Sequence, residues 1–450
     1  MSHRLTNIIA AGLLIFVFFI FFFSMKDDSL TMDELAHLPA GYSYLTQKDM
    51  RLNPEHPPLI KDLAAIPLLF IPNINFPSEI KAWEDDVNSQ WDFGNAFIFH
   101  SGNPAEKMIF WGRIPMILIL ILLGFYIFKI AKEFFGNKVG LLALFLFSFS
   151  PTFLAHGRLV TTDVGAATGA LIATYYFIKA LSSAGSPQAK KSVIKAGVVF
   201  GLAELTKFSL ILLIPLYIFL ALIWWLTKSR KIIPTLKTLI LVFIIGYLAL
   251  WPVYQYHTWN YPAEKQAQDT KFLLSSFNNR PLADSIIWMA DKPILRPYSQ
   301  YLLGLSIVLQ RAVGGNTTYF MGQVSRLGWK TYFPIVYFMK ETLVFHILTL
   351  IAILYAIWLR KKPSFLVFSL LSFITIYWLF SLKSNLNIGV RHLLPVFPFT
   401  FVLVSAGIIK LLKEPYLKIR YVILSGLIVW QIISVISVYP SFLAYFNEAA

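Results

Sequence analysis

Two adjacent carboxylic acids, Asp33 and Glu34, follow the first long apolar run of the chain, and His37 lies one helical turn further on. A carboxylate can accept the proton of a hydroxyl nucleophile, and two or three together can bind a divalent cation. Thr31 and Glu34 also have the spacing of a helix capping box, which explains Glu34 without chemistry. Because a capping box needs one acid, we predict Asp33 as the catalytic base, Glu34 as a second catalytic candidate and His37 as a substrate or metal contact.

A proline-rich segment, Asn53 to Leu59, carries a second acid and a second histidine, Glu55 and His56. Proline fixes its own backbone and disfavours helix in the residue before it, so both side chains are expected on an extended stretch. Such a segment can be a simple turn before a helix. It can also position ligand groups, and we predict that His56 hydrogen-bonds a phosphate and that Glu55 contacts substrate or metal.

The turn from Ala155 to Asp163 places three ionisable side chains, His156, Arg158 and Asp163, between two apolar runs. Helix capping explains Asp163 on its own about as well as a functional role does. The concentration of charge favours function, because a short connection needs only small polar residues. We therefore predict a catalytic role for Asp163 and a phosphate-binding role for Arg158.

Three more ionisable side chains stand where apolar runs begin or end, namely Lys207, Arg391 and His392. Lysine and arginine at such boundaries usually extend toward lipid headgroups. Together with the acids, however, they have the composition that transfer from a phosphate-linked lipid requires, because a departing phosphate needs positive charge rather than a general acid. The predicted phosphate clamp consists of His56, Arg158, Lys207, Arg391 and His392.

The composition indicates that most of the chain is solvated by lipid. Of 450 residues, 57% are hydrophobic and 14% are charged, which is more apolar surface than a soluble domain buries. The net charge of +16 comes from short basic clusters between apolar runs, so it indicates orientation in a membrane and not nucleic-acid binding. The absence of cysteine excludes disulfides, thiolate nucleophiles and zinc-thiolate sites.

Ten apolar runs have lengths near the roughly 20 residues that cross a bilayer, and a weaker run at 193–206 brings the predicted count to about eleven. They cover 6–24, 109–129, 139–155, 164–181, 193–206, 208–226, 233–253, 342–359, 364–382, 393–410 and 419–438. With the N-terminus in the cytoplasm, the inner connections are almost entirely basic and the acids gather on the other side, as the positive-inside rule requires. We predict an all-α polytopic membrane protein with a single transmembrane domain over 1–450.

Two predicted outer segments, 25–107 and 254–340, are too long to be simple connections. The first contains two amphipathic patterns, a helix from Thr31 to Leu45 that would lie along the membrane surface and a shorter helix from Leu59 to Phe70. These helices and the outer ends of the spans must position the carboxylates and cations. A site assembled from them would lie at the outer membrane interface, within reach of a lipid headgroup.

The motifs, taken in order, resemble those of a known family. They are the acid pair after the first run, Asn-Pro-Glu-His-Pro-Pro-Leu at 53–59, His-Gly-Arg and Thr-Asp within 156–163, Leu-Thr-Lys at 205–207, Gly-Trp-Lys-Thr-Tyr-Phe-Pro at 328–334 and Asn-Ile-Gly-Val-Arg-His-Leu-Leu-Pro at 387–395. Over nearly the whole chain they resemble the bacterial protein-mannosyltransferase-like branch of the GT-C glycosyltransferases, which is related to aminoarabinose transferase.

This resemblance implies an inverting transfer of a hexose or pentose from a polyprenyl-phosphate donor to a hydroxyl of a lipid, glycan or protein acceptor. It implies a multi-pass protein of the bacterial plasma membrane with a periplasmic or extracellular active site, in which Asp33 and Asp163 match the family's first-loop and second-loop acids. His56 stands where relatives use lysine against the donor phosphate, and a neutral imidazole is a weaker clamp. Relatives continue past Glu448 into a soluble C-terminal part, which we expect to be absent here.

Two alternative functions stay open at this stage. A transporter or flippase for lipid-linked saccharides would place ionisable groups near the midplane between paired repeats. The charges here gather at one interface instead, which favours an enzyme. An oligosaccharide ligase or oligosaccharyltransferase of similar architecture would move a whole glycan, and metal dependence would separate it from a single-sugar transferase. The sequence requires no cofactor, and a divalent cation held by the carboxylates is an open alternative.

Overall fold

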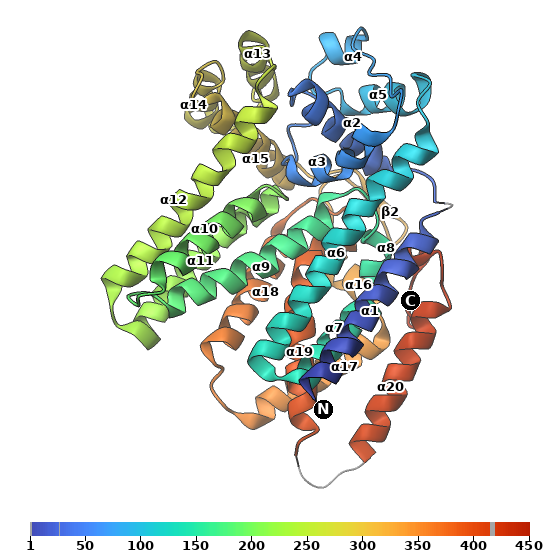
Figure 1. The fold of residues 1–450 in the computed structure, drawn as a ribbon, viewed down its shortest axis with the longest axis vertical. Coiled ribbons are helices and arrows are strands. Elements are labelled where there is room, and N and C mark those ends of the chain that lie inside the picture. The colour runs from blue at the N-terminus through green and yellow to red at the C-terminus, as the bar shows by residue number, and fades with distance from the viewer. Residues whose placement is uncertain (1, 27, 415–418) are drawn as a thin grey trace.

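The computed structural model describes residues 2–26, 28–414 and 419–450, and it is mainly helical (Figure 1). The predicted first outer loop and the connection before the last predicted span each include residues outside this description. The helices up to Ser182 are α1 His3–Ser24, α2 Met32–Gln47, α3 Leu59–Ala65, η1 Ile66–Phe70, α4 Lys81–Glu84, α5 Gln90–Asn95, η2 Ala96–His100, α6 Ala105–Phe135, α7 Asn137–Ser148, α8 Pro151–His156 and α9 Thr162–Ser182.

The second part of the chain continues this pattern of helices and adds one short hairpin. The helices are α10 Ala189–Glu204, η3 Phe208–Leu212, α11 Leu213–Trp224, η4 Trp225–Ser229, α12 Ile232–His257, α13 Ala263–Leu273, α14 Arg280–Met289, α15 Arg296–Gly314, α16 Tyr332–Met339, α17 Leu343–Leu359, α18 Phe365–Lys383, η5 Val390–Val396, α19 Phe397–Leu411, α20 Ile419–Ile436 and η6 Phe442–Ala444. The strands β1 Thr318–Phe320 and β2 Gln323–Ser325 pair in antiparallel fashion.

Among the described residues, eight helices are long and apolar enough to cross a membrane, or nine if the bent pair of α16 and α17 counts as one span. The eight are α1, α6, α9, α12, α18, α20 and the two continuous segments Phe208–Ser229 and Val390–Leu411. The predicted class of an all-α polytopic membrane protein is therefore confirmed. The predicted count of eleven spans is not.

Three predicted spans are shorter or broken in the structure. The run 139–155 divides into α7 and α8, because Ser150 caps a new helix that begins with Pro151. The run 193–206 lies in α10 up to residue 204, and this helix has 16 residues. Helix α17 has 17 residues and follows a bend of 112° after α16. These runs are apolar and helical as predicted, but their helices are shorter than the predicted spans.

A head region of short helices covers one end of the long helices (Figure 1). It consists of α2 to α5 from the predicted outer loop 25–107 and of α13 to α15 from the predicted outer loop 254–340. The helices predicted at 31–45 and 59–70 are confirmed as α2 and as α3 followed by η1. The head region and the helix ends beneath it supply the residues discussed below.

Helix α2 is packed against neighbouring helices on two sides. A helix lying along a membrane surface would be packed on one side only. A Cβ added to Gly41 would lie 2.1 Å from the carbonyl oxygen of Lys61 in α3. A Cβ added to Gly94 of α5 would lie 2.0 Å from the carbonyl oxygen of Leu35 in α2. Glycine thus allows α3 and α5 to approach α2 closely from two sides, which fixes the helix that carries Asp33.

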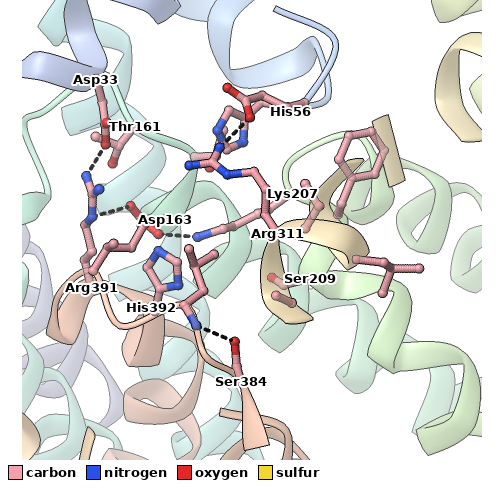
Figure 2. Close-up of a pocket in the computed structure, with 18 of the residues that line it drawn as sticks. Asp33, His56, Thr161, Asp163, Lys207, Ser209, Arg311, Ser384, Arg391 and His392 are labelled. Carbon is pink, nitrogen blue, oxygen red and sulfur yellow. Dashed lines mark hydrogen bonds and ion pairs between the residues drawn. The ribbon is translucent and has the colours of Figure 1, made fainter. Parts of the chain in front are cut away.

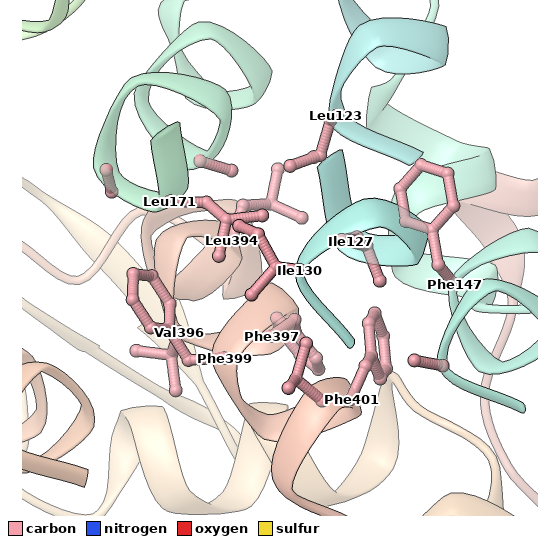
Figure 3. Close-up of a cluster of buried hydrophobic side chains, with 14 of the residues drawn as sticks. Leu123, Ile127, Ile130, Phe147, Leu171, Leu394, Val396, Phe397, Phe399 and Phe401 are labelled. Carbon is pink, nitrogen blue, oxygen red and sulfur yellow. The ribbon is translucent and has the colours of Figure 1, made fainter. Parts of the chain in front are cut away.

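The main hydrophobic core lies where α6, α7, α9 and α19 meet (Figure 3). Ile127, Phe147, Leu171 and Phe401, one from each of these helices, are at most 1% exposed. Within lipid, close packing of such side chains holds helices together, because lipid tails are as apolar as the side chains. Leu394 of η5 is fully buried in the same core. The core is therefore a fixed base for η5, the element that carries Arg391.

Candidate active site

A cavity between the head region and the long helices collects most of the predicted site residues (Figure 2). This front pocket occupies about 1230 Å³, including the part open to solvent. Its polar end is lined by Asp33, Glu55, Asp163, Lys207, Arg311 and Arg391, and also by His37, His56 and His392. These residues come from α2, the segment before α3, α9, the segment before η3, α15 and η5. The fold thus brings distant stretches into one cavity, as the predicted topology required.

Four charged side chains form a continuous chain across the polar end. Arg391 donates a hydrogen bond to Asp33, and its Nε lies 3.9 Å from Oδ2 of Asp163. Lys207 donates to the other carboxylate oxygen of Asp163. Figure 2 shows Arg391 between the two carboxylates. The two acids and two cations balance in charge and hold one another in a fixed arrangement.

The two carboxylates differ in their access to the pocket. The side chain of Asp33 is 27% exposed, whereas that of Asp163 is 4% exposed. Both oxygens of Asp163 meet cations, while the hydrogen bond from Arg391 is the single one to Asp33 among the described residues. Asp33 therefore has the access that a base requires, and Asp163 orients Lys207 and Arg391.

Local backbone features place the two cations. Lys207 lies just after the end of α10 and directly before η3, so it stands at a break between two helices. Gly389 has a φ of +117°, a conformation that residues with a side chain rarely adopt. It turns the chain immediately before η5, and Arg391 then reaches Asp33 of α2.

A second ion pair forms the opposite side of the polar end. Arg311, near the end of α15, donates to Glu55, and Nε2 of Gln90 in α5 donates to the other oxygen of Glu55 at 2.6 Å. The side chain of Arg311 is 40% exposed. A guanidinium has five N–H donors, and among the described residues Arg311 uses one. The others remain available to a ligand.

Two of the three histidines in the front pocket lie in the head region. Nδ1 of His37 donates to the carbonyl oxygen of Val160 at 2.9 Å, and its ring meets the ring of His56 edge-on at 4.9 Å. Burial lowers the pKa of His37 and, together with His37 and Lys61, lowers the pKa of His56 well below 6.5. Both rings are neutral at pH 7, so they act toward a ligand by hydrogen bonding alone.

Lys61 of α3 lies beneath the proline-rich segment. Its Nζ donates to the Tyr44 hydroxyl at 3.0 Å and to the carbonyl oxygens of Asn53 at 2.9 Å and His56 at 2.8 Å. Burial lowers the pKa of Lys61 to about 7. These bonds hold the segment in a non-helical form, as the prolines predicted, and they fix Glu55 and His56 at the pocket.

Glu34, a predicted catalytic residue, lies outside the front pocket. Its buried carboxylate accepts hydrogen bonds from Arg113 Nε at 2.8 Å and Nη2 at 2.7 Å, and from the Val160 N–H at 3.0 Å. Burial alone would raise the pKa of Glu34, but Arg113 and these bonds hold it below its usual value. The predicted capping box is present, since Glu34 also accepts a hydrogen bond from the N–H of Thr31 at 2.9 Å. Glu34 is a structural tie, and its predicted catalytic role is not supported.

Arg158, a predicted phosphate-binding residue, also lies outside the front pocket. Its Nη2 lies 2.5 Å from Oδ2 of Asp28, and its Nη1 donates to the Ser24 hydroxyl at 2.5 Å. The side chain is buried. Arg158 therefore joins the turn after α8 to the end of α1 and the segment that follows it, and it is not among the residues that line the front pocket.

The sequence did not predict Arg311 or Arg113 as important. Arg113 lies within the apolar run 109–129, and a charge in such a run is rare and usually paired or functional, so a signal was present. Arg311 stands in no motif. Its partner Glu55 is 256 positions away in the chain, and no local pattern connects the two.

Part of the front pocket is lined by apolar side chains. Leu305, Val308 and Leu309 of α15 line it together with Ile211 and Phe380. Ile211 and Phe380 lie in two of the candidate membrane spans, Phe208–Ser229 and Phe365–Lys383. One cavity thus combines the charged groups with an apolar part of the lining, here called the apolar arm.

Among the described residues, no group of three or more histidine, aspartate or glutamate side chains is arranged to hold a metal ion. The carboxylates of Asp33, Glu55 and Asp163 pair with arginine or lysine side chains instead. The predicted alternative of a divalent cation held by these acids gains no support from their arrangement.

Comparisons with known proteins agree with this architecture. Residues 105–251, from α6 into α12, match the family described as dolichyl-phosphate-mannose-protein mannosyltransferase. A search of curated proteins gave no match.

Three solved structures illustrate the likeness. The archaeal oligosaccharyltransferase AglB from Archaeoglobus fulgidus, in complex with an inhibitory peptide and a dolichol-phosphate, has a TM-score of 0.54 at 14% identity, covering 96% of this chain and 55% of that chain. The S. cerevisiae protein O-mannosyltransferase Pmt1-Pmt2 complex bound to the sugar donor gives 0.42 at 20% identity, with 58% and 34% covered. ArnT from Cupriavidus metallidurans bound to undecaprenyl phosphate gives 0.37 at 13% identity, with 90% and 78% covered. The last two superpositions are too loose to carry an argument.

The chain is a multi-pass membrane protein with the GT-C fold. It is similar to the protein mannosyltransferases over the matched residues, so the predicted resemblance is confirmed. The chain spans about half the length of the archaeal oligosaccharyltransferase, 55% of it, and at 14% identity the likeness shows the fold alone.

Proposed function

We propose that this protein transfers a sugar from a polyprenyl-phosphate donor to an acceptor hydroxyl. The observation that carries the proposal is the front pocket, where an accessible carboxylate, three cations and an apolar arm share one cavity. The cations suit a phosphate, the arm suits a lipid tail and the carboxylate suits a hydroxyl nucleophile. The GT-C fold, and the dolichol-phosphate bound to the archaeal structure, agree with this chemistry.

In the proposed step, the acceptor oxygen bonds to the anomeric carbon of the donor while the bond from that carbon to the phosphate oxygen breaks. The hydroxyl proton moves to the carboxylate of Asp33, and the electron pair leaves with the polyprenyl phosphate. Lys207, Arg311 and Arg391 stabilise the charge on the departing phosphate. Attack from the face opposite the phosphate inverts the anomeric centre.

We place this reaction at the outer face of a bacterial plasma membrane, with the N-terminus in the cytoplasm. The support is the basic character of the predicted inner connections and the position of the front pocket beneath the head region. A hexose or a pentose suits the pocket, and the step as written uses no cofactor.

A panel of polyprenyl-phosphate sugars tests this function through the release of lipid phosphate by the purified full chain. We expect release from at least one donor, and in Arg311→Ala a donor KM raised by about tenfold or more, since a hydrogen bond to a charged group contributes about 1.5–3 kcal/mol. Arg326→Ala is the matched control, because Arg326 is an exposed arginine of the same long loop outside the front pocket. Absence of release from every donor, or the same KM in both variants, would contradict the proposal.

A further inference from the structure

One aromatic side chain of the head region lines the front pocket and has no role in the reaction step described above. It is Trp91 of α5, which is 37% exposed. Among the described residues, its indole N–H makes no hydrogen bond and its ring contacts no other aromatic ring. Trp91 also borders a neighbouring cavity, which Asp92 and Phe272 line as well. A ligand in the front pocket can therefore meet this ring and its donor without breaking a contact within the protein.

The backbone that carries Trp91 is held on both sides. Gln90, directly before it, is 3% exposed, and its Nε2 donates to Glu55 at 2.6 Å. Gly94, three residues later, approaches the carbonyl oxygen of Leu35 in α2 so closely that a Cβ would not fit. A side chain whose backbone is already fixed loses less conformational entropy on binding a ligand than one on a free loop.

The groups that connect Trp91 to the rest of the polar end carry no net charge. Gln90 is an amide, and the carboxylate of Glu55 is balanced by its ion pair with Arg311. All four residues line the front pocket. This part of the lining offers hydrogen-bond donors and acceptors beside one aromatic surface.

A pyranose ring has the properties that complement such a lining. Its hydroxyls need hydrogen-bonding partners around the ring edge, which Gln90, Glu55 and the indole N–H supply. Its faces consist of C–H groups, which are favourably removed from water against an aromatic ring. A phosphate has no C–H face and a polyprenyl tail has no hydroxyls, so neither would use the indole and its polar neighbours together.

Arg311 links this part of the lining to the proposed phosphate clamp. It donates one hydrogen bond to Glu55, and its remaining N–H donors are available to the donor phosphate. The sugar of the proposed donor is bonded directly to that phosphate. A phosphate held by Arg311 therefore brings the sugar beside Glu55 and Gln90, the residue that precedes Trp91.

We propose that Trp91, together with Gln90 and Glu55, forms the subsite for the donor sugar, and that this sugar is a pyranose whose C–H face stacks on the indole. This assignment rests on the transferase function proposed above. Trp91 is a binding residue in it, and the proton transfer stays with Asp33.

Tryptophan is also common where proteins meet the headgroup region of a membrane. Trp91 differs from a residue of that kind because it lines a cavity that also contains ion pairs. Trp259, between α12 and α13, is 66% exposed and does not line the front pocket. It is therefore the matched control for removal of an exposed tryptophan.

The contribution of the sugar to donor affinity tests the subsite without turnover. Calorimetric titration of the detergent-solubilised full chain, without acceptor, compares undecaprenyl phosphate with the undecaprenyl phosphates of glucose, galactose and mannose. In the wild type, at least one of the three should bind more tightly than undecaprenyl phosphate. Trp91→Ala and Trp91→Gln should lose about tenfold of that gain, which corresponds to about two CH₂-sized groups left in water. Both should bind undecaprenyl phosphate as the wild type does.

Two further variants show whether the aromatic face is what matters. Trp91→Phe keeps such a face and should retain most of the gain, and Trp259→Ala should retain all of it. The subsite is refuted if no sugar adds affinity in the wild type, or if the gain is unchanged in Trp91→Ala and Trp91→Gln. It is also refuted if both variants lose affinity equally for undecaprenyl phosphate, because Trp91 would then serve the phosphate, the tail or the fold.

The outcome for the subsite is separable from the outcome for the transferase. If the gain is lost in Trp91→Ala and Trp91→Gln but no donor releases lipid phosphate in the presence of acceptors, the sugar subsite stands and the transferase function fails. If a donor releases lipid phosphate while the gain is the same in the wild type and in these variants, the transferase function stands and the subsite fails.

Discussion

Asp33 and Glu34 are neighbours in sequence but belong to two regions of opposite character. Glu34 pairs with Arg113 where the two side chains are 1% and 0% exposed, whereas Asp33 pairs with Arg391 where they are 27% and 21% exposed. The guanidinium of Arg113 makes hydrogen bonds to Glu34 and to the backbone of residues 28 and 29, so four of its five N–H donors are used. The pocket pair keeps an open carboxylate oxygen. Both pairs consist of an acid and an arginine. The structural pair of Glu34 and Arg113 differs from the candidate catalytic pair of Asp33 and Arg391 in its burial and in the number of hydrogen bonds already made.

The buried region also positions the pocket. The N–H of Val160 donates to Glu34 and its carbonyl oxygen accepts from His37, so one residue joins α2 to the turn that leads into α9. Asp33 is the second residue of α2, and Asp163 is the second residue of α9. The distance between the carboxylates of Asp33 and Asp163 therefore depends on the hydrogen bonds that Val160 makes to α2. We therefore expect changes in the buried region to alter stability, and changes in the pocket to alter binding and turnover.

Arg113→Ala should cause a large loss of stability, about 3–5 kcal/mol, because it leaves the carboxylate of Glu34 buried without its partner. Thermal unfolding of the detergent-solubilised chain measures it. The double variant Arg113→Met with Glu34→Leu removes both charges and should recover most of the stability. Unfolding of Arg113→Ala at the wild-type temperature would show that the two regions do not differ as described.

Arg391→Ala should have the opposite profile. Its ion pair with Asp33 is partly exposed, so we expect a change in stability within about 1 kcal/mol. Loss of a charged donor from the clamp should weaken binding of polyprenyl phosphate by about 1.5–3 kcal/mol, which is roughly tenfold to a hundredfold. Calorimetric titration of the folded variant checks this, and wild-type affinity would count against the clamp.

Lys61→Met should change the pH dependence of stability. The pKa of Lys61 is about 7 in the folded protein against 10.5 for the free side chain, so the unfolded state binds more protons between these values. Stability from this group therefore rises with pH across that window, by up to about 1.4 kcal/mol per pH unit. Unfolding temperatures at pH 7, 8 and 9 should rise less steeply in Lys61→Met. Equal slopes would mean that Lys61 is charged in the folded state.

Local pattern was sufficient to predict α2, α3 and most of the charged residues that line the front pocket. The spacing of apolar residues gave α2 and α3, and the clustering of charge at the ends of apolar runs led to Asp33, Asp163, Lys207 and Arg391. Topology was enough to bring them together, because alternation of the spans sends these ends to one side of a membrane. Prediction worked where a residue's neighbours in sequence determine its place.

The remaining features depend on packing between distant segments. The pairing of Arg311 with Glu55, and the capture of Glu34 by Arg113 of α6, follow from how the head region sits on the long helices. A contact such as Gly41 against the carbonyl of Lys61 sets that fit, and no periodicity reveals it. The excess in the predicted span count has the same origin, because helix breaks such as the one at Pro151 depend on what surrounds the run.

The role of Asp33 as proton acceptor is tested most directly by separating donor binding from turnover in Asp33→Asn. Asp291→Asn is the matched control, because Asp291 is an acid of the head region that pairs with Lys292 away from the front pocket. General base catalysis contributes about 10²–10⁴-fold, so turnover of Asp33→Asn should fall by at least about a hundredfold while its affinity for the polyprenyl-phosphate donor stays close to that of wild type. Unchanged turnover in Asp33→Asn, at equal amounts of folded protein, would contradict the account.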